Sequence, residues 1–223
     1  MTLQSRCAQL DASLAVLIQR STLQEHPDTR AFGAYAERTV KDNWLGLCRQ
    51  WGVEAEPHPG ARSIFDASFR ANGFRLGIDI KSKNLGSERY ADGGVCSVGN
   101  LVPFLLYGNI LVLCELGYRV TARSVAFEYL TTAPIHALPI DMLRIENLGT
   151  GQVRLERSLH DAELSWDRAP KDFLALFAPL CLAHYRKVAR VAQRRAKAIE
   201  TFIESGYRSL SLNASSLNEG QSE

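Results

Sequence analysis

Stretches whose apolar residues recur every three to four positions alternate along the chain with stretches in which they recur every second position. Helical spacing covers residues 3–19, 31–51 and 171–205, and strict alternation covers residues 62–70 and 74–83. The run from Ile110 to Val120 predicts a buried strand, and residues 143–147 and 152–157 predict a second hairpin. This order of elements predicts an α/β or α+β fold with a central mixed sheet flanked by helices.

The elements predict one domain over residues 1–209, with a core at about 31–157 and a C-terminal helical arm at about 171–205. Residues 210–223 are rich in Ser and Asn and predict a disordered tail.

The first hairpin is the most informative segment of the sequence. Asn72-Gly73 joins its two strands as a two-residue turn, so paired residues have numbers that sum to 145. Asp66 is then expected directly opposite Asp79, with Lys81 on the same face. The other face is predicted to be apolar, and consists of Phe65, Ala67, Phe69, Ala71, Phe74, Leu76, Ile78 and Ile80.

Two carboxylates opposed across a strand pair repel each other, and a divalent cation that binds both would offset this repulsion. Lys81 would then be placed to hold an attacking water or the charge of a phosphate. An alternative is a solvated hairpin face on which Lys81, Arg70 or Arg75 neutralises the aspartates.

These residues resemble a known motif. Phe65-Asp66, twelve further residues and then Asp79-Ile80-Lys81 resemble the PD-(D/E)XK nuclease motif, and residues 77–82 are similar to the catalytic strand of EcoRV/HincII-type restriction endonucleases. Similarity extends over about residues 62–120. At position 65 the family has Pro and this chain has Phe.

The resemblance implies a restriction-endonuclease-like fold and Mg²⁺-dependent cleavage of double-stranded DNA at a short palindrome by a homodimeric type II restriction endonuclease. Asp66 and Asp79 would bind Mg²⁺ with the Ile80 carbonyl, and Lys81 would orient the water. Glu37 would be the upstream acidic residue. The DNA contacts it implies are Lys83, Asn84, Arg89 and Ser97.

Alternatives remain at several points. Another nuclease of the same fold, such as a repair nickase or a junction resolvase, or a non-catalytic DNA-binding protein, would fit the same residues. Glu37 could simply pair with Lys41 on a helix surface. The basic run from Arg186 to Lys197 could contact phosphates or form a solvated helix face.

Composition adds modest constraints. The net charge is +2, with 20 Arg and only 6 Lys, so no global basic field indicates a nucleic-acid partner. Five scattered Cys without a CxxC pair predict reduced thiols. Neither a signal peptide nor a membrane span is predicted, so we expect a soluble, cytoplasmic protein without a membrane partner.

Overall fold

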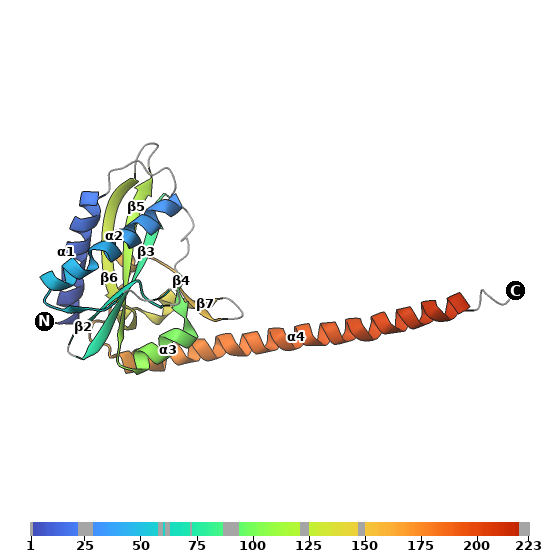
Figure 1. Ribbon diagram of the computed structural model, residues 1–223. Coiled ribbons are helices and arrows are strands. Elements are labelled where there is room, and N and C mark those ends of the chain that lie inside the picture. Colours follow the sequence, from blue (N-terminus) through green and yellow to red (C-terminus); the bar gives the residue numbers. More distant parts are fainter. Residues whose placement is uncertain are drawn as a thin grey trace. The chain divides into compact units, whose positions relative to one another are not determined.

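The computed structural model describes residues 2–21, 29–57, 60, 63–71, 73–86, 94–120, 125–146 and 150–218. Side chains are described for these residues except 20–21, 29–31 and 206–218. The chain forms two compact units, Met1–Cys181 and Leu182–Glu223. The first unit holds the sheets, and the second contains the greater part of the C-terminal helix (Figure 1).

A five-stranded mixed sheet forms the centre of the first unit. Its strands lie in the order β1-β2-β3-β5-β6. β3 is parallel to β5, and the other neighbouring pairs are antiparallel. The strands are β1 (Glu54–Ala55), β2 (Ala67–Ala71), β3 (Phe74–Asn84), β5 (Ile110–Val120) and β6 (Val125–Pro134).

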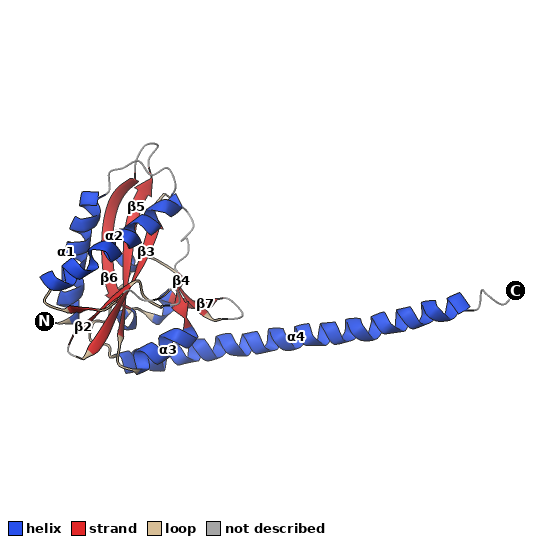
Figure 2. Cartoon of the chain, in the orientation of Figure 1, coloured by secondary structure: helices blue, strands red, loops and turns tan. Residues whose placement is uncertain are grey.

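Helices α1 (Leu3–Ser21) and α2 (Thr29–Gln50) cover one face of this sheet (Figure 2). Their apolar stripes pack on alternate residues of the strands, including Phe69, Ile78 and Ile80. Trp44 of α2 is fixed in this layer, because its indole N–H donates to the Ser68 carbonyl at 2.8 Å. The even-numbered residues of β3 therefore face the helices.

The opposite face carries a second layer with its own apolar core. That layer contains a three-stranded sheet in the order β4-β8-β7, the helix α3 and the start of α4. These elements are β4 (Gly94–Ser97), α3 (Val98–Leu106), β7 (Leu143–Glu146), β8 (Gln152–Leu155) and α4 (Pro170–Asn218), with short 3₁₀ turns at Ile135–Ala137, Ile140–Met142 and Leu159–Asp161. Phe173 and Phe177 of α4 are fully buried in this core.

The predicted mixed α/β fold with a central sheet is confirmed. β5 has the predicted bounds, and both hairpins form. The sequence did not predict α3, because its apolar residues merge with those of β5 into one apolar stretch. β2 is shorter than predicted and begins at Ala67.

The predicted single domain over residues 1–209 differs from the two units observed, whose boundary falls within α4. α4 also continues to Asn218, through the segment predicted as a disordered tail. Leu210, Ala214 and Leu217 recur there at helical spacing, which accounts for the extension. Among the described residues, the helices lack a segment long and apolar enough to cross a membrane.

Candidate functional site

The β2–β3 hairpin has the predicted register from Ala67, which pairs with Ile78, to Ala71, which pairs with Phe74. Gly73 in the turn has φ +83°, as a two-residue turn of this kind requires. The ladder stops one residue short of Asp66. The Asp66 N–H donates to the Ile78 carbonyl at 2.8 Å. Asp66 therefore does not pair directly across from Asp79, contrary to the prediction.

Phe65 also lies differently from the prediction, which placed it on the apolar face with Ala67 and Phe69. Its ring instead packs over Gly77, on the sheet face opposite the helices, and against Phe104. The alternation of side chains breaks where β2 begins, because residues before Ala67 are not held in the ladder. Phe65 thereby anchors the chain next to Asp66.

Asp66 occupies the edge of β3 that β2 leaves open. Its Oδ2 accepts a hydrogen bond from the Ile80 N–H at 2.8 Å. The N–H and C=O of one strand residue point toward the same neighbouring strand, so the Ile80 carbonyl is directed to the same side as Asp66. The Asp66 carboxylate and the Ile80 carbonyl thus lie at one open edge.

Asp79 points from β3 into the layer opposite the helices and is 5% exposed. Its Oδ1 accepts a hydrogen bond from Lys81 Nζ at 2.8 Å, and its Oδ2 has no partner among the described residues. Burial raises the pKa of Asp79 to about 7, although the ion pair with Lys81 opposes the rise. Asp66 and Glu37 raise that pKa further, so the three carboxylates form one electrostatic group.

Helix α2 approaches Asp66 from the other face of the sheet. Lys41 Nζ lies 3.5 Å from Asp66 Oδ1 and also donates to Glu37 one helical turn earlier. Helix α2 packs closely against β3 at Gly33, where an added Cβ would lie 2.6 Å from Ser82 Oγ. Lys41 therefore bridges the helix and the strand edge.

Glu37 forms the surface pair with Lys41 that the sequence offered as an alternative to a catalytic role. The same lysine connects Glu37 to Asp66, and Glu37 raises the pKa of both Asp66 and Asp79. Sequence reasoning treated Lys41 only as a partner of Glu37. The period of the helix would have placed both side chains on one face, but it could not indicate which strand that face meets.

The balance of charge at the site favours a further cation. Burial raises the pKa of Asp66, and its hydrogen bond from Ile80 and the charges of Lys41 and Lys81 only partly oppose this. Three carboxylates, Glu37, Asp66 and Asp79, thus share two ammonium groups. A cation near Asp66 and Asp79 would lower the pKa values of both carboxyl groups.

The donor set fits Mg²⁺ in part. Within the described ranges, no group of three or more His, Cys, Asp and Glu side chains is arranged to hold a metal ion. Mg²⁺, however, commonly uses one or two carboxylates and completes its shell with water and phosphate oxygens. Asp66, the unpartnered Oδ2 of Asp79 and the Ile80 carbonyl supply such a set of oxygens.

Two of the four predicted DNA contacts lie at the end of β3. Lys83 and Asn84 are half-buried there, and Asn84 Oδ1 accepts the Gly86 N–H at 3.0 Å. Ser97 ends β4 and precedes α3, with a half-buried side chain. Arg89 lies outside the described residues.

A buried carboxylate beside Lys81 was not predicted. Glu115 of β5 pairs in register with Lys81 and is fully buried. It accepts hydrogen bonds from the Tyr129 and Ser158 hydroxyl groups and from the Leu159 N–H. These bonds tie the turn at Leu159–Asp161 to the sheet. A single acidic residue within the apolar run 110–116 was the available signal.

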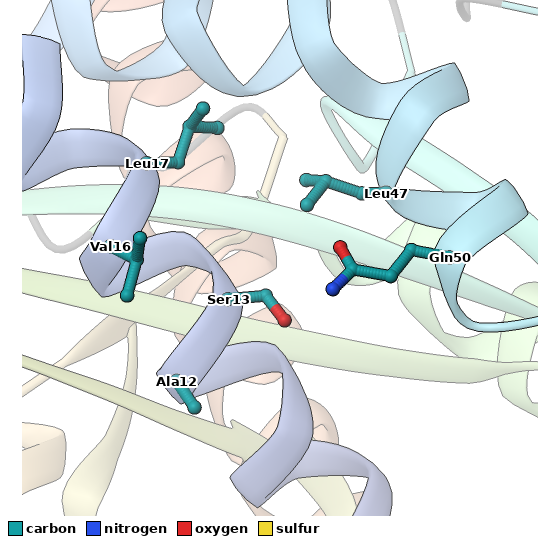
Figure 3. A pocket seen from close by; sticks show the side chains of 6 residues that line it. All are labelled: Ala12, Ser13, Val16, Leu17, Leu47 and Gln50. Atoms are coloured by element: carbon teal, nitrogen blue, oxygen red, sulfur yellow. The ribbon is translucent and has the colours of Figure 1, made fainter.

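A separate hollow of about 420 Å³ lies between α1 and α2 (Figure 3). It is lined by Ala12, Ser13, Val16, Leu17, Leu47 and Gln50, none of which ionises. None of these described residues is an acid or a base, and none is a predicted site residue. The hydroxyl oxygen of Ser13 accepts a hydrogen bond from the Trp51 indole N–H at 3.2 Å. The chemistry available in the first unit is concentrated at the β3 edge.

No model of a known protein family matches the chain, and no curated protein matches it in sequence. The function of the chain is therefore inferred from the geometry of the site.

Proposed function

We propose that this protein is a Mg²⁺-dependent endonuclease of double-stranded DNA that acts at the β3 edge, and more specifically a homodimeric type II restriction endonuclease. The observation that carries the proposal is the buried carboxylate of Asp79, which lies within electrostatic reach of Asp66 and accepts a hydrogen bond from Lys81. One buried oxygen of Asp79 has no partner in the described part of the chain. An unsatisfied buried carboxylate oxygen is costly, so its retention favours a bound cation or water.

The described residues have distinct roles in this proposal. Asp66, Asp79 and the Ile80 carbonyl would hold Mg²⁺. The ion would supply Lewis-acid stabilisation of the negative charge that builds up on the phosphate. The Ile80 N–H fixes the orientation of Asp66, and Lys41 neutralises it from the helix side.

Lys81 supplies a positive charge beside the carboxylates. Its side chain is 21% exposed, and its ammonium group donates to Asp79 at 2.8 Å. An ammonium group has three donors, so Lys81 can keep this bond while it donates to a water or a phosphate oxygen. Asp79 thus positions Lys81, and Lys81 in turn orients the nucleophile and stabilises developing charge.

Supercoiled plasmid incubated with the protein tests this function. With Mg²⁺ we expect linear products with discrete fragment patterns, and with EDTA we expect none. Asp79→Asn and Lys81→Met should each lower the cleavage rate roughly a hundredfold or more. Asp141→Asn is the matched control, since Asp141 is 68% exposed and pairs only with Arg157 in the described part of the chain.

Each outcome separates the candidates. Discrete fragments support a restriction endonuclease, and nicked circles support another nuclease of the same fold. Absence of cleavage with Mg²⁺, Mn²⁺ and Co²⁺ would contradict both and favour a non-catalytic DNA-binding protein. Normal cleavage by a folded Asp79→Asn protein would show that the site lies elsewhere.

A further inference from the structure

The second unit carries a dense run of cations on α4 (orange to red in Figure 1). Six Lys or Arg lie within the twelve residues from Arg186 to Lys197, and no acidic residue occurs from Phe173 to Ile199. All six side chains are exposed. Within the part of the chain whose side chains are described, none of the six forms an ion pair. Their charge is thus uncompensated there.

The helix gathers most of these cations on one side. At about 100° per residue, five of the six fall within an arc of about 100°, and Arg195 lies outside it. The five are Arg186, Lys187, Arg190, Arg194 and Lys197. Four of them line a single hollow on the helix surface together with Gln193. We call these five residues the basic face.

The side of the helix opposite the basic face is mixed in character. It presents the exposed Ala189, Ala192, Ala196 and Arg195, together with the half-buried Val188. A helix that lies on a lipid surface needs bulky apolar residues opposite its cations. Tyr185 and Ile199 provide these only at the two ends of the basic segment. The pattern therefore favours electrostatic binding to a polyanion rather than binding to a membrane.

We propose that the basic face binds the phosphate backbone of duplex DNA without regard to sequence. The inference rests on the proposed function, which supplies DNA as the substrate. Three of its five residues are Arg, whose planar guanidinium forms bidentate hydrogen bonds with phosphate. The face would raise the affinity for any duplex and leave recognition to the first unit.

The dimensions of the face suit this partner. Eleven helical steps separate Arg186 from Lys197, which is about 17 Å along the axis. Duplex DNA carries one phosphate charge per roughly 1.7 Å of its axis, so about ten phosphates lie within that length. Five cations can therefore each reach a separate phosphate.

Salt-dependent binding to a fluorescent duplex without divalent metal tests the proposal on the full chain. The variant is the triple substitution Arg186→Gln, Arg190→Gln and Arg194→Gln, since Gln has a helix propensity close to that of Arg. Affinity at moderate salt should fall about tenfold or more. The slope of log K against log salt should become shallower by roughly two to three, because each phosphate contact contributes about 0.9.

The control makes the same change in net charge elsewhere. Arg119, Arg144 and Arg157 are exposed and pair with carboxylates, so their replacement by Gln should leave the slope nearly unchanged. Equal slopes for the two triple variants would overturn the proposal. So would a basic face that binds phosphatidylserine vesicles and not DNA. A different result is a wild-type protein that binds DNA without cleaving it, while the triple variant of the basic face shows a shallower salt slope. That result would support this inference and contradict the proposed nuclease function.

Discussion

At the scale of single residues, the site depends on carboxylates held where water cannot fully solvate them. Asp79 is buried with one oxygen unpartnered, and Asp66 is held between the Ile80 N–H and Lys41. Burial raises the pKa of each carboxyl group, and the two lysines only partly compensate. Cations placed near these residues therefore favour the charged form of both carboxyl groups.

Lys41 is expected to act as a positioning residue for Asp66. Its charge lowers the pKa of Asp66, so Lys41→Met should raise that pKa, and the acid limb of the pH–rate profile should move to higher pH. Carbon NMR titration of the Asp66 carboxyl group measures the shift independently of activity. Arg38→Met removes the same charge from an exposed position on α2 and should change neither quantity. An unchanged titration in Lys41→Met would contradict the role.

Asp11 provides a pH test of stability away from the site. Burial raises its pKa to about 7, although hydrogen bonds from Thr132 oppose the rise. The folded protein therefore keeps a proton that the unfolded chain loses above about pH 4, so the contribution of Asp11 to stability falls as pH rises from about 4 to 7. Asp11→Asn removes this dependence.

The Asp11→Asn protein should exceed the wild type by roughly 1–3 kcal/mol in free energy of unfolding at pH 8 and match it near pH 4. Urea unfolding at the two pH values measures the difference. Asp79 has a pKa raised in the same direction, but it is present in both proteins and cancels in the comparison. If the difference in free energy of unfolding between the two proteins did not change with pH, the raised pKa of Asp11 would be refuted.

At the scale of elements, the hairpin is shaped by one close contact. Phe65 packs over Gly77, and the Arg75 guanidinium lies 6.0 Å from the centre of the Phe65 ring on the same face. This contact sets the course of the chain just before Asp66. The strand therefore needs a residue without a side chain at position 77.

Gly77→Ala tests this contact, because the added Cβ would lie 2.5 Å from Cδ1 of Phe65. The change should destabilise the protein by about 1–3 kcal/mol and lower cleavage by displacing Asp66. Gly46→Ala is the matched control: a Cβ there meets nothing within 4 Å, and Ala should stabilise α2 by about 0.4–1 kcal/mol. Thermal melting and plasmid cleavage measure both effects, and equal melting temperatures would argue against a role for Phe65.

At the scale of the whole molecule, the division within α4 separates a folded body from a cationic helix. Residues 170–181 belong to the first unit, where Phe173 and Phe177 are fully buried. The remainder of α4 forms the second unit and exposes Ile199 and Phe202. Stability and DNA affinity should therefore depend on different parts of one helix.

Two truncations test this division. A chain ending at Cys181 should melt within a few degrees of the full chain and bind DNA more weakly, because it keeps the buried aromatic residues and loses the basic face. A chain ending at Ala169 loses Phe173 and Phe177, each worth about 3–5 kcal/mol, and should not fold stably. Calorimetry measures the melting temperatures of both truncated chains. Equal melting temperatures would contradict a boundary between the two units at Cys181.

The features that depend on local periodicity could be predicted from the amino-acid sequence. Alternation and the Asn72-Gly73 turn identified the β2–β3 hairpin and its register, and the apolar run identified β5. These predictions succeed because a one-residue slip would expose every buried side chain of the strand. Asp79 and Lys81 were found for the same reason, since they alternate with the apolar residues.

Tertiary structure alone decided what meets these elements. The parallel pairing of β3 with β5, the approach of Lys41 to Asp66 and the burial of Glu115 all join residues distant in the chain. The break in alternation at Phe65 also arises from packing over Gly77. Periodicity records which face of an element is buried. It does not record the partner, because many apolar surfaces could cover that face equally well.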